Sequence, residues 1–390
     1  MNRWEHITIL LFAQMIASAL LFGCASTPGR DRPLYPVMAT AVSPDNNFIA
    51  VSTNYQEVAY FDTSPFQFRS LLTPEDVKTK PKLSGILHSP PLAFSPDGRL
   101  LIAAGVKGRV VGWDVKSSSQ KFSSIIEPGV VDIAVFPDSR AFITAGPEAA
   151  IWSIDTGSLI DKLELPTETK ATSVSVSPDG QAIFVGLSSG DIAVYSSANR
   201  KLIRKWKGHQ VSVTGLAFAP DGKTLASTAG LFDPHLWKID SELRSVETAP
   251  NVDLKTTALQ SALSPQEVAA RLVAGAAIML GDPGELLIAL LDSMYEDKDI
   301  LQVNSKQCGP RLAFSPDGRY LAATAHLIML SGGEFQVFLT DLKSHKTRAI
   351  VGIYGCSVAF ARDSKLLITG GLGAPVLWDV ETGQEVIIGK

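Results

Sequence analysis

Ala93-Phe94-Ser95-Pro96-Asp97 is one copy of a short pattern that recurs along the chain: an alternating apolar run, a Ser-Pro-Asp turn and a second apolar run. Proline fixes φ at such a turn, the aspartate side chain accepts hydrogen bonds from nearby backbone, and a glycine that often follows supplies a positive φ. Alternation before the turn is typical of a strand with two different faces. The pattern therefore predicts a β-hairpin at each copy.

The pattern returns along most of the chain, and a second landmark accompanies it. The other copies are Ala41-Val42-Ser43-Pro44-Asp45, Ala134-Val135-Phe136-Pro137-Asp138, Val174-Ser175-Val176-Ser177-Pro178-Asp179, Ala217-Phe218-Ala219-Pro220-Asp221, Ala313-Phe314-Ser315-Pro316-Asp317 and the altered Ala359-Phe360-Ala361-Arg362-Asp363. About 17 residues after most of these turns comes an aromatic or apolar residue closely followed by aspartate, as in Trp113-Asp114 and Trp378-Asp379. Self-similarity at a fixed period indicates a repeat architecture.

Together with Gly208-His209, these landmarks resemble the WD40 repeat over residues 37–390. The resemblance implies an all-β fold, a single β-propeller of four-stranded blades arranged in a ring. It also implies that one blade is locked by a network of buried polar side chains, which satisfy one another's hydrogen bonds. In this sequence the members of that network would be His209, Ser227, Asp233 and Trp237.

The number of blades depends on a stretch without an obvious turn. Asp221 and Asp317 are 96 residues apart, about twice the repeat. With Gln266 in the turn position, the intervals between turn positions all lie between 41 and 52 residues, which favours eight blades. The alternative is seven blades with a helical insert at about 251–307, where Ser264-Pro265-Gln266-Glu267 has the form of a helix N-terminus with a capping box.

The first 24 residues differ from the rest. A nearly continuous apolar run over residues 7–23 is typical of a secretory signal. Its end, Leu21-Phe22-Gly23-Cys24, resembles the bacterial lipobox, which implies a signal peptide over 1–23, acylation of Cys24 and a tether over 24–36. Ala25 after the cysteine implies sorting to the outer membrane, facing the periplasm. The alternative is an uncleaved N-terminal anchor in which Cys24 is an ordinary thiol.

Several kinds of chemistry are not predicted. The net charge is −4 and no basic stripe occurs, so we expect no nucleic-acid partner. The six histidines show no metal-ligand spacing and no cysteine cluster accompanies them, so no metal and no cofactor are predicted. Gly186-Leu187-Ser188-Ser189-Gly190 matches a nucleophile-elbow motif, but that motif needs a following helix and the next residues have the pattern of a strand. We interpret it as a hairpin turn, and no catalytic residue is predicted.

Cys308 and Cys356 precede the first strands of two consecutive predicted blades. In an oxidising compartment they could form a disulfide that ties the two blades together. A disulfide needs Cα atoms within about 7 Å, which is closer than neighbouring blades usually approach away from the inner edge of the ring. Either a disulfide or two unpaired thiols is consistent with the sequence.

Two repeats are longer than the others between the turn and the second landmark. The distance is 26 residues from Gln266 to Asp292 and 24 from Asp317 to Asp341, which predicts longer hairpins between the second and third strands. These stretches are apolar and carry methionine, which is common at adaptable binding surfaces. The predicted partner surface consists of Ile278, Met279, Leu280, Leu286, Ile328, Met329, Leu330 and Phe335. The alternative is that the two hairpins pack on each other.

The function predicted from the sequence is therefore that of a non-catalytic, protein-binding propeller scaffold. The lipobox resemblance places it at the membrane as a lipoprotein, in cell-envelope assembly or maintenance. One alternative is a ligand sensor or carrier that uses the central channel. Another is an exported hydrolase or oxidoreductase, which no tested motif favours.

Overall fold

A computed structural model of the chain describes residues 39–52, 57–64, 66–74, 91–105, 108–126, 129–229, 234–240, 243, 245–247, 312–329, 332–353, 357–370 and 375–386. By contacts, Tyr35–Lys390 forms one compact unit. Within the described ranges, no helix is long and apolar enough to cross a membrane. The predicted signal peptide and tether, and with them Cys24, lie outside these ranges.

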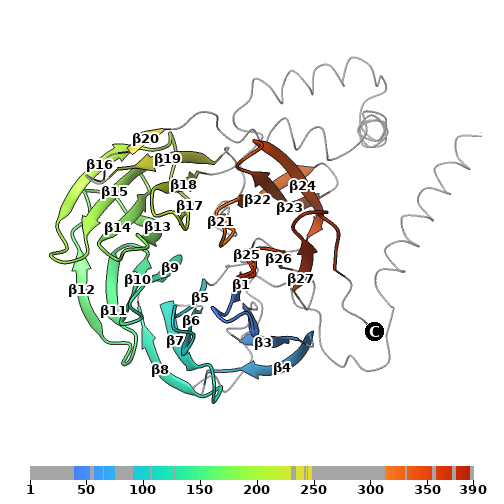
Figure 1. Ribbon diagram of the computed structural model, residues 1–390. Helices are drawn as coiled ribbons and strands as arrows, with labels where there is room; N and C mark the ends of the chain where they lie inside the picture. Colours follow the sequence, from blue (N-terminus) through green and yellow to red (C-terminus); the bar gives the residue numbers. More distant parts are fainter. Residues whose placement is uncertain are drawn as a thin grey trace, which may run out of the picture. The chain divides into compact units, whose positions relative to one another are not determined.

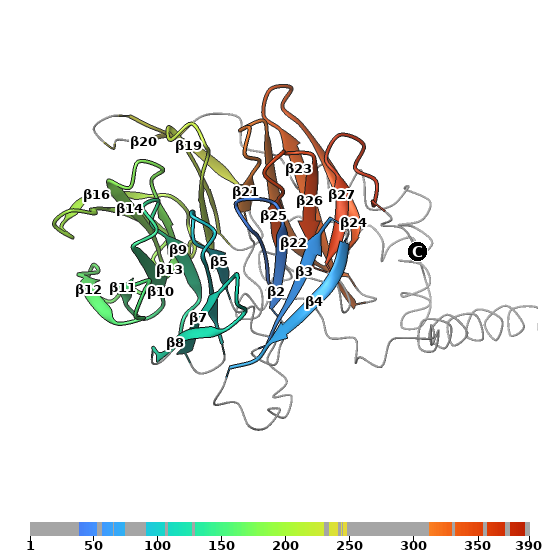
Figure 2. The same cartoon turned by 60° about the horizontal axis from the view of Figure 1, so that its bottom comes forward.

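Within the described residues, the strands form seven antiparallel sheets, which we call blades 1 to 7 in chain order (Figures 1 and 2). Blade 1 contains β1 (Ala39–Val42), β2 (Phe48–Ser52), β3 (Val58–Thr63) and β4 (Phe66–Leu72). Blade 2 contains β5 (Leu92–Phe94), β6 (Leu100–Ala104), β7 (Arg109–Asp114) and β8 (Gln120–Ile125). Blade 3 contains β9 (Asp132–Val135), β10 (Ala141–Ala145), β11 (Ala149–Ser153) and β12 (Leu159–Leu163). Blade 4 contains β13 (Ala171–Val176), β14 (Ala182–Leu187), β15 (Asp191–Ser196) and β16 (Leu202–Lys207).

The last three blades follow the same order from the inner to the outer strand. Blade 5 contains β17 (Gly215–Phe218), β18 (Thr224–Thr228), β19 (His235–Ile239) and β20 (Ser245–Glu247). Blade 6 contains β21 (Leu312–Phe314), β22 (Tyr320–Met329), β23 (Gly332–Asp341) and β24 (Lys346–Ile353). Blade 7 contains β25 (Val358–Phe360), β26 (Leu366–Thr369) and β27 (Val376–Asp379).

The inner strands close into a ring of seven, so the prediction of eight blades is wrong. Each inner strand contacts the next in the order β1, β5, β9, β13, β17, β21 and β25, and β25 contacts β1. Blade 6 packs directly on blade 5, since a Cβ placed on Gly318 would lie 3.9 Å from Cδ of Pro220. No blade fits between them, although 64 residues separate Glu247 from Leu312. The predicted helical insert at 251–307 lies outside the described residues.

The repeated turn has the local structure that its sequence predicts. In blade 2 the Ser95 hydroxyl donates to the Asp97 carboxylate at 2.6 Å, and Asp97 accepts from the backbone N–H of Arg99 at 3.0 Å. The residue after the aspartate has a φ between 57° and 73° in all seven blades. This left-handed conformation explains why glycine occupies that position in four of the seven turns, since glycine adopts it without a steric penalty.

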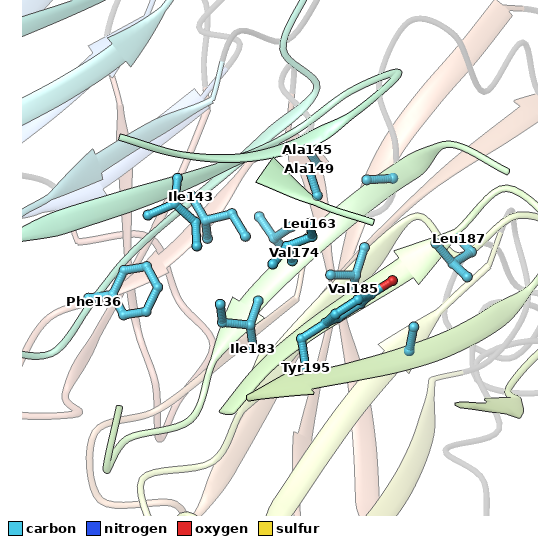
Figure 3. Packing of buried hydrophobic residues seen from close by; sticks show 13 residues of the cluster. Phe136, Ile143, Ala145, Ala149, Leu163, Val174, Ile183, Val185, Leu187 and Tyr195 are labelled. Carbon is cyan, nitrogen blue, oxygen red and sulfur yellow. The ribbon is translucent and has the colours of Figure 1, made fainter. Parts of the chain in front are cut away.

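The blades pack face to face through apolar side chains. Figure 3 shows the cluster between blades 3 and 4, where Ile143 and Val185 are fully buried and Val185 lies beside Tyr195. Burial of a large aliphatic side chain contributes about 1.5–3 kcal/mol, so each blade interface is a substantial part of the stability. Because every inter-blade interface is built this way, the ring is a rigid support for the turns at its two ends.

Candidate functional site

The predicted network in blade 5 is formed by three of its four residues. Ser227 lies on β18 and Trp237 on β19, whereas His209 comes from the connection that leads from blade 4 into blade 5. The Trp237 indole N–H donates to Ser227 Oγ at 2.8 Å, and Ser227 Oγ shares a hydrogen bond of 2.7 Å with His209 Nε2. All three side chains are buried. The network therefore fixes the connection to the two middle strands of the blade. Asp233 lies outside the described residues.

A serine hydrogen-bonded to a histidine is also the arrangement in which a histidine base activates a serine nucleophile. Burial, and then the nearby His235, lower the pKa of His209 to about 3, so the imidazole is neutral near pH 7 and is a poor general base. Ser227 is fully buried, so no substrate atom can approach its hydroxyl. The pair is suited to holding the blade together and not to catalysis.

Gly190 allows the backbone of the connection at His209 to pass close to the turn between β14 and β15. Its carbonyl oxygen accepts from the backbone N–H of His209 at 2.9 Å, and its φ is 86°. A Cβ at this position would lie 2.2 Å from the His209 carbonyl oxygen, so only glycine fits. Gly190 ends the nucleophile-elbow match, which the structure places in the turn between β14 and β15. The interpretation of that motif as a hairpin turn is confirmed.

Two other blades contain the same tryptophan–hydroxyl pair without a histidine. Trp152 donates to Thr144 Oγ1 at 3.0 Å in blade 3, and Trp378 donates to Thr369 Oγ1 at 2.8 Å in blade 7. In blade 2 the position equivalent to Ser227 is Ala103, which offers no acceptor. The hydroxyl partner of the tryptophan thus recurs in several blades, and among the described residues only blade 5 adds a loop histidine to it.

His235 belongs to this cluster and was missed by the sequence interpretation. Its ring centroid lies 4.4 Å from that of His209 and 5.8 Å from that of Trp237. The signal was available, since His235 precedes Trp237 by two residues and therefore lies on the same face of a strand.

For the candidate partner surface, the structure describes the course of the backbone in part and not the side chains. The hairpin β22–β23 pairs over ten positions, from Tyr320↔Asp341 to Met329↔Gly332. The equivalent hairpin of blade 2 pairs over five positions, from Leu100↔Asp114 to Ala104↔Val110. The structure thus confirms a longer hairpin after Asp317 and includes in it the backbone of Ile328, Met329 and Phe335. The other predicted members of the surface, Leu330 and Ile278, Met279, Leu280 and Leu286, lie outside the described residues.

The remaining predicted site residues are not placed. Cys308 and Cys356 lie outside the described residues, so the two alternatives for them stay open. In the part of the chain that the structure describes, no three His, Cys, Asp or Glu side chains are grouped as a metal site would require.

Comparisons with known proteins agree with this geometry. Residues 200–233, which include His209 and Ser227, match the WD40 family model, described as WD domain, G-beta repeat. The chain is 24% identical over 213 residues to WD repeat-containing protein 90 of Xenopus tropicalis, a match that covers 51% of this chain and 11% of that protein. The chain therefore spans about a tenth of the length of this relative.

A solved structure shows the same fold over nearly the whole chain. The β-propeller domain of Cps50 (Swd1) from Myceliophteria thermophila superposes with a TM-score of 0.63 at 13% sequence identity. The superposition covers 90% of this chain and 95% of that domain. The chain thus contains a WD40 repeat and has the β-propeller fold.

Proposed function

We propose that this WD40-type β-propeller is a non-catalytic scaffold that binds protein partners at the cell envelope. The observation that carries the proposal is the extended hairpin β22–β23, which breaks the regularity of the ring. WD40 propellers commonly act as protein-interaction scaffolds, and in such folds the function resides in the elements added to the frame.

The extension is large enough to form a binding element. Five additional residue pairs correspond to about 16 Å of strand beyond the level at which the blade 2 hairpin ends. The outer strand β24 extends with it, because Phe335 pairs with Ile353. A three-stranded projection is better supported than an isolated hairpin, which is only marginally stable in water.

The added residues have the composition of a partner surface. Residues 327–330 read Leu-Ile-Met-Leu. Contiguous apolar residues that project from a soluble domain mark interaction sites, and methionine allows such a surface to adapt to its partner. The similar stretch around Met279 is proposed to contribute to the same surface.

Partner capture tests this surface. The full chain with Met279→Asp and Met329→Asp should lose the specific partners that co-purify with the wild-type chain and should keep its circular dichroism spectrum and melting temperature. The matched control is Ile125→Asp, at an exposed aliphatic residue on β8, which should keep every partner. An unchanged partner set in the double variant would eliminate the hairpin as the binding surface.

The location is a second part of the proposal. It rests on the lipobox resemblance at Cys24, with acyl chains holding the chain in the outer membrane and the propeller facing the periplasm; two or more acyl chains anchor a protein firmly. Cys24→Ser should abolish metabolic labelling with palmitate and shift the chain out of the outer-membrane fraction. Labelling and fractionation identical to wild type would refute acylation.

A further inference from the structure

The outer strands of the first four blades share a β-bulge at an equivalent position. In each blade the pairing between the third and fourth strands skips one residue of the fourth strand, near the end of that strand that follows the turn. The skipped residues are Arg69 in blade 1, Lys121 in blade 2, Ile160 in blade 3 and Ile203 in blade 4. A bulge at a sheet edge protects the edge or redirects a side chain, so the residue placed there has consequences.

The bulge residues divide into two kinds. In blades 1 and 2 they are cations engaged in ion pairs, with Arg69 Nη1 2.9 Å from Asp62 Oδ1 and Lys121 Nζ 3.6 Å from Asp155 Oδ1. In blades 3 and 4 they are isoleucines, 51% exposed at Ile160 and 45% exposed at Ile203. Cations and bulges are the usual protection of a sheet edge against pairing with another chain, and blades 3 and 4 lack the cation at the bulge.

The exposed aliphatic residues lie on the outer strands of two consecutive blades, β12 and β16. Leu159 precedes Ile160 and Leu202 precedes Ile203, and these leucines are 47% and 46% exposed. Arg200, in the turn just before β16, places its Nε 3.9 Å from Oδ2 of Asp161 on β12. We call the four residues Leu159, Ile160, Leu202 and Ile203 the rim patch.

A cationic strand borders the rim patch. Five of the eight residues in 200–207 are lysine or arginine. Arg200 approaches Asp161, and Lys205 and Lys207 lie 3.3 and 4.0 Å from Asp191. Within the described chain, Lys201 and Arg204 have no ion pair. The border of the patch on blade 4 therefore carries positive charge that a partner could neutralise.

We propose that the rim patch and the β16 edge bind an extended segment of a partner protein that is rich in acidic and aliphatic residues. β16 ends its sheet, so the outer backbone groups of Arg204–Lys207 can pair with an added strand. Aliphatic residues of that segment cover Ile160 and Ile203, and its carboxylates lie against Lys201 and Arg204. An anionic membrane is disfavoured as the occupant, because lipid headgroups cannot add a strand to the β16 edge.

This surface lies on blades 3 and 4 and is separate from the β22–β23 hairpin of blade 6. The inference rests on the proposed scaffold function only in that its occupant is a protein. Met329→Asp, which tests the hairpin, therefore serves here as a variant that should bind normally, and the two proposals can fail independently.

The test measures fluorescence anisotropy of a short fluorescein-labelled peptide of alternating glutamate and valine with the full chain in mild detergent. We expect saturable binding that weakens with added salt. The double variant Ile160→Gln, Ile203→Gln should weaken binding about five-fold or more, and Arg204→Glu should do the same, since a loss near 1 kcal/mol has that effect. The matched control Lys121→Gln, at the equivalent bulge of blade 2, should bind as wild type does. Polar side chains already occupy this bulge in blades 1 and 2, so glutamine is compatible with the fold.

Three results would overturn the proposal. One is the absence of saturable peptide binding, and another is equal binding by the wild type and both rim variants. The third is that the rim variants lose binding to phosphatidylglycerol vesicles and not to the peptide, which would assign the patch to a lipid surface.

Discussion

The turn of blade 2 and the turn of blade 7 occupy equivalent places in the ring, yet they are held in different ways. Ser95–Gly98 closes on itself, because the Ser95 hydroxyl accepts from the backbone N–H of Leu100 at 2.9 Å and donates to Asp97. In the turn Ala361–Ser364, alanine and arginine take the first two positions, where the blade 2 turn has serine and proline. Arg362 instead donates its backbone N–H to Asn46 Oδ1 at 2.5 Å, and its guanidinium donates to the Pro44 carbonyl at 2.7 Å. Both turns bond to the next blade, since Asp97 donates its backbone N–H to Ser139 Oγ, but the altered copy adds a guanidinium bond to this contact.

The difference follows from the connectivity of the chain. Six blade junctions are joined by a continuous chain, whereas blade 7 meets blade 1 without a peptide connection. The outer edge of blade 7 is met by C-terminal residues, with Glu385 bridging to Trp378 and Val386 donating to Leu377 at 2.8 Å. Among the described residues, hydrogen bonds and apolar packing alone hold this junction, which we call the seam.

Junctions elsewhere in the ring use a simpler contact. Where the fourth turn residue is glycine, it lies against the proline of the preceding turn, as Gly180 does on Pro137. Where it is serine, its side chain accepts a backbone N–H from the preceding turn, as Ser139 does from Asp97 at 3.1 Å. The non-glycine residues adopt an unfavourable positive φ, and in exchange they bond to the neighbouring blade.

The largest effect is expected at the inner strands of the seam. Ser357 Oγ accepts from the backbone N–H of Thr40 at 2.5 Å and lies 2.7 Å from Thr40 Oγ1, and both residues are buried. Ser357→Ala leaves two buried polar groups of Thr40 without this partner, so the free energy of unfolding should fall by about 2–4 kcal/mol. Urea denaturation followed by tryptophan fluorescence measures the change.

Ser124→Ala is the matched control at a connected junction. The Ser124 hydroxyl donates to the Gly157 carbonyl at 2.7 Å, which joins blade 2 to blade 3. Its loss should cost about 1 kcal/mol. Equal losses in the two variants would show that the seam is no more sensitive than a junction with a continuous chain.

A smaller effect is expected from making the seam turn like the others. Arg362→Pro removes both the backbone donor and the guanidinium, and should lower the free energy of unfolding by about 1 kcal/mol. The direction of this change in the free energy of unfolding is informative. Proline at a compatible turn position otherwise stabilises a protein by about 0.4–1 kcal/mol, because it reduces the entropy of the unfolded state. Arg362→Ala keeps the N–H and should have a smaller effect. A stabilised Arg362→Pro variant would show that the bonds to Asn46 and Pro44 contribute nothing.

Much of this architecture could be predicted from the sequence, and the failures have physical causes. The hairpins were predictable because a Ser-Pro-Asp turn is determined by local chemistry. The blade count was not, because spacing along the chain does not measure adjacency in space, and the residues between Glu247 and Leu312 need not enter the ring. Ser227 and Trp237 were predictable from the repeat pattern. The exposure of Ile160 and Ile203 was not predictable, because a bulge changes which residue is paired and the alternation of the sequence alone does not reveal a bulge.

The smallest expected effect concerns the pKa of the turn aspartate, in a regular turn that is made more like the seam turn. In blade 4 the Ser177 hydroxyl, and then the backbone N–H of Gln181, hold the pKa of Asp179 below its usual value of 3.8. The lowered pKa means that the carboxylate stabilises the fold above about pH 3.8, and that this stability is lost as the pH falls through the folded pKa. Ser177→Ala puts into blade 4 the alanine that the seam turn has at Ala361. It should raise the pKa of Asp179 and shift acid unfolding to slightly higher pH, which carboxyl NMR titration and circular dichroism measure. Ser175→Ala, two residues earlier on β13, should leave both unchanged. If the pKa of Asp179 does not move in Ser177→Ala, the backbone N–H groups alone hold the carboxylate, as they would in the turns of blades 3, 5 and 7, which lack this serine.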